Sequence, residues 1–205
     1  MPRTALFVID IQNELAGHPQ TEVPGAARIR AAGSQILRIS RALADAAAAA
    51  AAATPPDQQQ KPALTVFVQH EEKPESGTLV RGAEPWKLVF PPREDAADEI
   101  LIAKTTRNTF ESNPDLADRL QNAGVDHIMA FGLQSECCVG ETCKGALAAG
   151  FRLTLLQGAH STYDEKDKTA GDIERQIEEM LVSRGAEVVP WERAVSRWET
   201  AGVVC

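Results

Sequence analysis

Three side chains with complementary chemistry each follow an apolar segment of the chain. Asp10 comes after TALFVI, Lys104 after EILIA, and Cys138 a few residues after HIMAF. An acid, a cation and a thiol are the parts of an activated nucleophile, in which the carboxylate takes the thiol proton and the cation stabilises the resulting charges. Taken singly, each residue type is also common in a structural role: an Asp as a turn residue, a Lys as a solvated charge and a Cys as a small buried side chain. Their shared position after apolar segments favours a joint catalytic role.

Cys138 begins a segment rich in small residues, with VGETCKGALAAG following it, which is typical of a helix packed closely on a sheet. A cysteine at a helix N-terminus faces the positive end of the helix dipole, and Lys104 adds a positive charge nearby. Because both effects favour the thiolate, the sequence predicts a thiol pKa below its ordinary value.

The apolar segments predict the strands that position these residues. They are short and continuous, as is typical of strands buried on both faces of a parallel sheet. The six expected strands cover residues 4–9, 63–69, 99–103, 127–131, 151–156 and 186–189. The expected helices cover residues 25–44, 113–124 (with Asn113 as N-cap and Pro114 in the first position), 138–149 and 168–183.

Strands and helices alternate strictly after residue 95. This order predicts one α/β domain over residues 1–205, with a three-layer α/β/α, doubly wound, Rossmann-like fold around a six-stranded, mainly parallel sheet. Ligands of such sheets bind beyond the carboxyl ends of the strands, where Asp10, His70, Lys104 and Cys138 are expected.

Three segments fall outside this alternation. Residues 71–95 are rich in Pro, Gly and charge, and a loop of this length in a compact domain predicts an active-site lid. The alanines at 46–53 can extend the preceding helix, and the Pro/Gln stretch after them predicts a solvated loop. The C-terminal stretch VPWERAVSRWETAGVVC is expected to dock on its own domain or on a neighbouring subunit.

Composition and charge argue against several classes of function. The 205 residues carry 21 basic and 29 acidic side chains, a net charge of −8, whereas nucleic-acid surfaces and polybasic membrane anchors need an excess of positive charge. There is no run of about 18 apolar residues, and the N-terminus lacks the pattern of a signal peptide. We therefore expect no nucleic acid and no membrane as partners. Three of the four cysteines are adjacent or nearly adjacent, which makes a poor disulfide framework. We therefore expect free thiols and a cytoplasmic location.

Three blocks of the sequence resemble the signature blocks of the isochorismatase-like cysteine hydrolases: ALFVIDIQNEL, IAKTTRNTF and FGLQSECCVGETCKGALAAGF. The resemblance covers nearly the whole chain in the same block order, and the third block is the most specific. It implies that Cys138, followed by Val139 and Thr142, is the nucleophile. It implies further that Asp10 is the acid/base and Lys104 the lysine of a catalytic triad.

The resemblance also implies an oxyanion hole and a reaction. A cis peptide at Leu133–Gln134 would direct the N–H groups of Gln134 and Cys138 at a developing oxyanion. The reaction is metal-independent hydrolysis of a C–N bond in a small amide, carbamoyl or imide substrate through a thioester, with no organic cofactor.

Metal binding is not expected, although the nicotinamidases of this superfamily carry a metal site. That site has an Asp and a His two residues apart, followed by further histidines. The chain has no such pair before His70 and no second histidine directly after it. His70 itself is expected to be a packed strand-end residue or a substrate contact.

The candidate substrate-binding residues are Leu15, Trp86, Phe110 and Tyr163. Phe110 matches a family position that lines the pocket, and Trp86 lies in the expected lid. The expected partner is a small-molecule substrate, and the family implies a homo-oligomer, either a dimer or a tetramer.

Three other functions fit parts of the sequence. Isochorismatase-type vinyl-ether hydrolysis stays open, although it does not need a nucleophilic cysteine. A catalytically idle binding or scaffold member would use Cys138, beside Cys137, as a redox-sensitive thiol. A receiver would use Asp10 as phospho-acceptor, but it gives Lys104 and Cys138 no joint role.

Overall fold

The computed structural model describes residues 3–51, 55 and 61–205 of the chain. The last two alanines of the alanine tract and most of the Pro/Gln stretch after it lie outside this range. Among the helices within it, none is long and apolar enough to cross a membrane.

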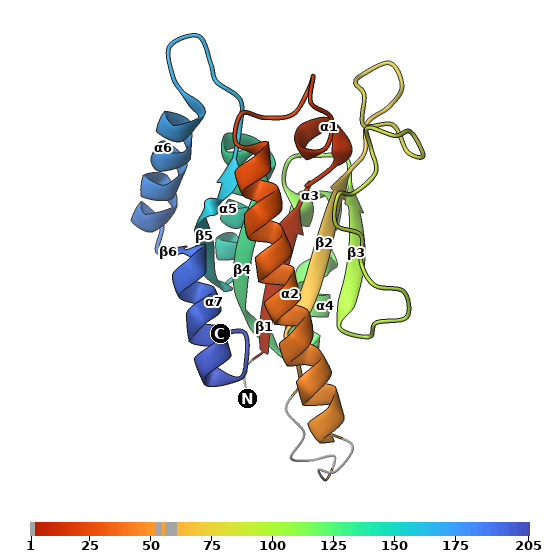
Figure 1. Cartoon of the computed structure of the whole chain (residues 1–205), viewed down its shortest axis with the longest axis vertical. Helices are drawn as coiled ribbons and strands as arrows, with labels where there is room; N and C mark the ends of the chain where they lie inside the picture. The colour runs from red at the N-terminus through yellow and green to blue at the C-terminus, as the bar shows by residue number, and fades with distance from the viewer. Residues whose placement is uncertain (1–2, 52–54, 56–60) are drawn as a thin grey trace.

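A six-stranded sheet in the order β3-β2-β1-β4-β5-β6 forms the centre of the molecule (Figure 1). Its strands are β1 (Arg3–Ile9), β2 (Leu64–His70), β3 (Glu99–Lys104), β4 (Val125–Leu133), β5 (Arg152–Ser161) and β6 (Glu187–Pro190). Every neighbouring pair runs parallel, so the predicted doubly wound sheet is confirmed. The strand order reverses between β1 and β4, which is where such folds bind ligands.

Helices cover both faces of this sheet and give three layers (Figure 1). On one face lie α1 (Asn13–Ala16), α2 (Ala26–Ala51) and α7 (Trp191–Ala201). On the other lie α4 (Leu116–Asn122), α5 (Gly140–Ala148) and α6 (Ala170–Ser183), with the short α3 (Thr109–Ser112) beside α5. A π-helix (Ser135–Val139) joins β4 to α5. Residues 46–51 of the alanine tract continue α2, which is the extension that the sequence allows.

The side chains of the central strands alternate between two apolar cores. In β1, Leu6 and Val8 point into the core under α2 and α7, whereas Phe7 and Ile9 point into the core under α4, α5 and α6. Burying a side chain of this size contributes about 1.5–3 kcal/mol. The residues that follow these strands are therefore held in fixed positions by both cores.

The helix expected to start from Asn113 begins later, at Leu116, and Asn113 is not its N-cap. The Asn113 amide donates instead to the carbonyl oxygens of Ala103 and Thr109, both at 3.0 Å. It thereby closes α3, a short helix that the sequence pattern does not reveal and that Asn108 caps at its start. Asparagine side chains bond to nearby backbone groups in several such ways, so the pattern alone does not say which helix each one caps.

The C-terminal stretch docks on its own sheet as α7. Trp198 is fully buried in the core under α2, and its indole Nε1 donates to the carbonyl oxygen of Cys205 at 3.1 Å. Of the two expected docking partners, the chain therefore uses its own domain.

The loop at 71–95 is fastened to the segment that follows β1. The hydrogen bonds that hold it include those from Asn13 N to Lys87 O (2.8 Å), from Val89 N to Ile11 O (2.9 Å) and from Gln12 Nε2 to Trp86 O (2.8 Å). Residues 86–89 therefore form a strap, and the parts of the loop that line the site are Glu72 and the turn containing Thr78 and Leu79. A lid role stays a prediction, and it applies to that turn.

Candidate active site

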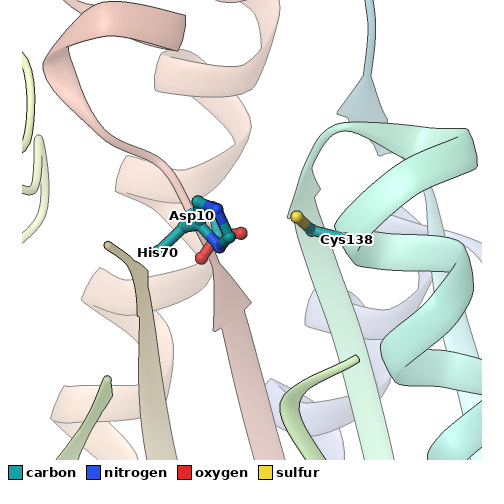
Figure 2. A group of neighbouring side chains, drawn as sticks. All are labelled: Asp10, His70 and Cys138. Atoms are coloured by element: carbon teal, nitrogen blue, oxygen red, sulfur yellow. The ribbon is translucent and has the colours of Figure 1, made fainter. Parts of the chain in front are cut away.

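Four neighbouring strands bring Asp10, His70, Lys104 and Cys138 to one edge of the sheet. Asp10 follows β1, His70 ends β2, Lys104 ends β3, and Cys138 lies in the π-helix after β4. Figure 2 shows Asp10 and His70 side by side, with the sulfur of Cys138 directed towards them. One polar atom of each of these three side chains lies within 4.8 Å of the other two. The strand-end residues singled out in the sequence thus meet in space.

A close approach of β4 to β1 shapes the site beneath Asp10. Gly132 has a φ of 134°, and a Cβ at this position would lie 2.0 Å from the carbonyl oxygen of Ile9. Only glycine fits there without displacing β1. Asp10, which directly follows Ile9, has a φ of 49°. This left-handed backbone region is rare for residues other than glycine and often marks functional positions.

The ammonium group of Lys104 is the centre of the site. Its Nζ lies 2.8 Å from Asp10 Oδ2, 3.0 Å from His70 Nδ1, 3.1 Å from Cys138 Sγ and 3.1 Å from the carbonyl oxygen of Thr106. The side chains of Lys104 and Asp10 are 0% and 1% exposed. Burial lowers the pKa of Lys104, but Asp10 and Cys138 outweigh it and raise the pKa above its ordinary value. Lys104 is therefore charged at neutral pH.

His70 is the residue that the sequence reasoning undervalued. It pairs with Lys104 in the register of β2 and β3, which brings the two side chains together. Burial lowers the pKa of His70, and the neighbouring Lys104 charge lowers it further. The imidazole is therefore neutral, and its Nδ1 accepts a hydrogen bond from Lys104. The available signal was its position at the end of β2, next to the strand that carries Asp10.

Asp10, His70 and Cys138 could also be read as three ligands of a metal ion, because each offers one atom to a common point. Lys104 Nζ, however, lies within 3.1 Å of an atom of each of them. A metal ion at this point would face an adjacent ammonium group, so the residues present fit a metal poorly. The absence of a metal stays a prediction that this geometry favours.

The thiol of Cys138 does not have the lowered pKa that the sequence predicts. Burial raises its pKa, the negative charge of Asp10 raises it further, and Lys104 lowers it by less. The prediction was wrong because it counted the helix dipole and Lys104 but neither the loss of solvent nor the carboxylate. The resting group is a thiol, and the Asp10 carboxyl group lies beside it.

The turn before Cys138 offers a free backbone donor. The Leu133–Gln134 peptide bond is cis, as the resemblance implies. Within residues 3–51, 55 and 61–205, no group accepts a hydrogen bond from the Gln134 N–H. The carbonyl oxygen of Gln134, by contrast, accepts from Cys137 N at 3.2 Å and from Val139 N at 3.0 Å. Gln134 and Cys138 both line the cavity above the thiol. A free N–H at this position is what an oxyanion donor requires.

Thr142, the threonine of the third signature block, joins α5 to α3. Its Oγ1 accepts a hydrogen bond from Thr109 N at 3.2 Å and donates to the carbonyl oxygen of Arg107 at 3.3 Å. Thr142 is buried and does not line the cavity. Its contacts fix the chain that leads from Lys104 to Arg107.

A cavity of about 330 Å³ opens over the thiol. Its lining combines the site residues with apolar and charged side chains: Asp10, Glu14, Leu15, His70, Glu72, Thr78, Leu79, Arg107, Gln134, Cys137, Cys138 and Tyr163. Of the four expected substrate contacts, Leu15 and Tyr163 lie in this lining. Glu14 and Glu72 give it negative charges that the sequence reasoning did not assign, and Arg107 adds a positive charge.

Trp86 and Phe110, the other two expected contacts, do not line this cavity. Phe110 packs with its ring centroid 6.0 Å from those of Phe7 and Phe151, in the core under α4 and α5. Trp86 contributes its carbonyl oxygen, which accepts from Gln12 and Gln69. The geometry gives no support to a substrate-binding role for either, since both aromatic residues serve packing or strap contacts.

A second cavity, of about 380 Å³, lies at the opposite end of the sheet, beside the C-terminal tail. Its lining includes His127, Arg152 and Cys205 but none of the strand-end residues described above. Because the convergent acid, cation and thiol lie around the smaller cavity, the candidate active site is there.

The order and geometry of these residues agree with a comparison against known families, in which the Isochorismatase domain matches residues 4–192. The chain belongs to the isochorismatase family. It is a hydrolase of the isochorismatase-like cysteine hydrolase group, which agrees with the resemblance carried by its three sequence blocks.

Relatives of known sequence and structure agree with this membership. Two proteins named streptothricin hydrolase, from Streptomyces noursei, are 31% identical over 201 residues and 32% identical over 184 residues. These alignments cover 95% and 89% of this chain, but only 71% and 58% of the relatives. The fold is similar to that of a cysteine hydrolase from Pseudomonas syringae pv. phaseolicola 1448A, with a TM-score of 0.77 and 20% identity, covering 97% of this chain and 93% of that one.

Proposed function

We propose that this chain hydrolyses a C–N bond of a small amide, carbamoyl or imide substrate through a thioester on Cys138. The observation that carries the proposal is the position of Lys104 Nζ, 2.8 Å from Asp10 Oδ2 and 3.1 Å from Cys138 Sγ in a buried site. An acid, a cation and a thiol within hydrogen-bond reach are the parts of an activated nucleophile.

The number of protons on Lys104 suggests how the thiol is activated. An ammonium group has three N–H donors, but four acceptors surround Lys104 Nζ. While the thiol keeps its proton it needs no donor, and the Asp10 carboxylate beside it can accept that proton. When that proton moves to Asp10, the carboxyl group becomes neutral and its attraction to the ammonium group weakens. Lys104 Nζ can then donate a hydrogen bond to the new thiolate.

The thiolate then attacks the substrate carbonyl carbon, and the oxyanion accepts hydrogen bonds from the N–H groups of Gln134 and Cys138. Asp10 returns its proton to the leaving nitrogen as the C–N bond breaks, which leaves a thioester on Cys138. Asp10 next takes a proton from water, whose oxygen attacks the thioester carbon. The C–S bond breaks, the acid product leaves, and Asp10 returns the proton to the Cys138 thiolate. No organic cofactor or metal takes part.

The cavity and the relatives guide the choice of substrate. A volume of about 330 Å³ suits a small molecule rather than a protein chain. Since the relatives described above carry the name streptothricin hydrolase, streptothricin is one compound to test beside simple amides, ureas and imides.

The test is release of ammonia or amine from this panel by the wild-type chain and by Cys138→Ser. We expect turnover of at least one C–N substrate, complete loss in Cys138→Ser, and a trapped acyl adduct on Cys138 by intact-mass spectrometry. The matched control is Cys205→Ser, which alters an exposed thiol at the other end of the sheet and should leave turnover unchanged.

Two results would contradict the proposal. One is amide turnover that survives in Cys138→Ser. The other is turnover of a vinyl ether alone, without dependence on Cys138, which would favour the isochorismatase-type reaction. The expected single domain, homo-oligomer and cytoplasmic location stay predictions beside this one.

A further inference from the structure

A second hydrogen-bonded chain of side chains lies behind the turn that carries the nucleophile. Ser135 Oγ lies 2.8 Å from His160 Nδ1, and His160 Nε2 lies 3.2 Å from Glu178 Oε1. Gln157 Nε2 donates to the other oxygen of Glu178 at 2.7 Å. Ser135 and His160 are 0% exposed, and the Glu178 side chain is 13% exposed. We call Ser135, His160 and Glu178 the buried relay.

An irregularity in β5 creates this relay. Ala130 pairs with Leu155, but Gly132 pairs with His160, so β5 carries extra residues opposite a short stretch of β4. Gly158, inside this bulge, has a φ of 79°. Bulges of this kind redirect a side chain next to functional sites. Here the bulge sets His160 beside the end of β4, where the nucleophile turn begins.

The two ends of His160 fix the direction of its hydrogen bonds. The Glu178 carboxylate can only accept, so His160 Nε2 carries a proton and donates to it. In the tautomer that this hydrogen bond selects, Nδ1 is an acceptor, and the Ser135 hydroxyl donates to it. Burial raises the pKa of Glu178, but the hydrogen bonds from His160 and Gln157 outweigh it, so the carboxylate stays charged. The relay therefore holds Ser135 in one orientation.

Ser135 stands between the two backbone donors of the candidate oxyanion hole. It directly follows Gln134 and precedes Cys138 in the same five-residue π-helix. The next residue, Glu136, is held by the residue that directly follows β5, since Thr162 Oγ1 donates to Glu136 Oε1 at 2.9 Å. Two successive residues of the turn are thus tied to the strand end that the bulge displaces.

We propose that His160 is a positioning residue, which holds the Gln134 and Cys138 N–H groups in place for acyl transfer by way of Ser135. This inference rests on the proposed function, because it assumes an oxyanion in the cavity. A serine–histidine–carboxylate set can also be a hydrolytic triad. Here Ser135 is fully buried and outside the cavity lining, so no substrate reaches its hydroxyl group.

The test compares two reactions of Cys138 that differ in one respect. Acylation by 4-nitrophenyl acetate passes through an oxyanion, and its first turnover is read as a burst of 4-nitrophenolate. Alkylation by iodoacetamide displaces iodide from carbon and forms no oxyanion, and its rate is read by intact-mass spectrometry. The variants are Ser135→Ala, His160→Gln and the conservative Ser135→Thr, which keeps the hydroxyl group.

We expect the acylation rate to fall about tenfold to a hundredfold in Ser135→Ala and His160→Gln, because misplaced donors lose much of their effect. The alkylation rate should stay within about twofold of wild type, because the surroundings of the thiol are unchanged. Ser135→Thr should restore most of the acylation rate. If His160→Gln fails to fold by circular dichroism, Ser135→Ala and Ser135→Thr decide the question.

Equal acylation rates in wild type, Ser135→Ala and His160→Gln would overturn the positioning role and leave the proposed function intact. A parallel fall of acylation and alkylation would also overturn it, since a general loosening of the fold affects both reactions. A wild-type chain that alkylates at Cys138 but gives no burst would overturn the proposed acyl transfer itself, and the inference with it.

Discussion

The Nδ1 atom of His70 lies 3.0 Å from the Nζ atom of Lys104 at the end of two paired strands. Because a protonated imidazole at this distance would be repelled by the ammonium group, the His70 imidazole stays neutral. His70 therefore adds no charge to the group formed by Asp10, Lys104 and Cys138. Because the folded chain keeps His70 neutral, the free energy of unfolding at acidic pH depends on this active-site residue.

The first prediction concerns stability at mildly acidic pH. The pKa of His70 is lowered from 6.5, first by burial and then by Lys104. As pH falls below about 6.5, the unfolded chain binds a proton that the folded chain refuses, so the free energy of unfolding decreases. One such group contributes up to about 1.4 kcal/mol per pH unit until its folded pKa is reached. Urea unfolding of wild type and His70→Asn at pH 7.5 and 5.5 measures this loss, which His70→Asn should reduce.

His127 provides an independent comparison at the other end of the sheet. Burial lowers its pKa as well, with Arg152 adding to the effect. His127→Asn should remove its own share of the pH dependence, and the double variant the sum of both, because the sites are far apart. An unchanged slope in His70→Asn would mean that His70 is protonated in the folded chain.

The second prediction separates thiol ionisation from catalysis. The carboxylate of Asp10 raises the pKa of Cys138, whereas Lys104 lowers it. Asp10→Asn removes the first effect and keeps the second, so the thiolate becomes more abundant at pH 7. Alkylation of Cys138 by iodoacetamide should become faster, while amide hydrolysis falls about 10²- to 10⁴-fold for want of an acid/base. The two rates are measured on the same protein by mass spectrometry and by ammonia release.

A control for this experiment is the double variant Asp10→Asn with Cys138→Ser, which must lose the rapid adduct. Cys143 is fully buried and should not react under native conditions. Slower alkylation in Asp10→Asn, in parallel with lost hydrolysis, would show that the thiol needs Asp10 to ionise at all.

The third prediction concerns the buried ion pair. Lys104→Met leaves the 1% exposed Asp10 carboxylate without its cation, which should cost about 3–5 kcal/mol of unfolding free energy. Adding Asp10→Asn removes the stranded charge and should recover most of this loss. The matched control is Arg152→Met, which breaks an exposed pair with Asp126 and should cost about 1 kcal/mol or less. A double variant no more stable than Lys104→Met would show that the pair is not energetically coupled.

The sequence predicts the sheet well because strands buried on both faces must be continuous apolar runs. Their ends place Asp10, Lys104 and Cys138 correctly, since the carboxyl ends of parallel strands share one edge. β5 is the exception: its second half, QGAHS, is polar, and the sequence prediction ended at Leu156. Gln157 and His160 in that half bond to Glu178 of α6, and a partner so distant in the chain leaves no local pattern.

Side-chain environments were harder to predict than positions. The thiol pKa depends on the sum of burial, carboxylate and ammonium, and the sequence prediction counted only the ammonium and the helix dipole. Phe110 follows Lys104 closely, yet α3 turns its ring to Phe7 and Phe151. His70 gains its role from strand pairing, which sequence separation conceals. Each of these outcomes is a tertiary effect on a residue whose local pattern allows several environments.

The fourth prediction concerns the charge of the substrate. Apart from Asp10, which pairs with Lys104, the cavity lining holds two carboxylates, Glu14 and Glu72, and one guanidinium, Arg107. Glu72 is held in place by a hydrogen bond from Leu79 N at 3.0 Å. We therefore expect the chain to prefer a cationic amide over a neutral or anionic one of similar size.

Glu72→Gln should raise the KM of a cationic amide by about two- to fivefold, leave kcat unchanged, and have little effect on a neutral amide, because a partly solvated charge contributes about 1 kcal/mol or less. The measurement is kcat/KM for the N-acetylated amides of lysine, norleucine and glutamate at two salt concentrations, since screening should weaken the preference. Glu71→Gln is the matched control: Glu71 pairs with Arg81 outside the cavity lining. Preference for the glutamate compound would instead assign substrate recognition to Arg107.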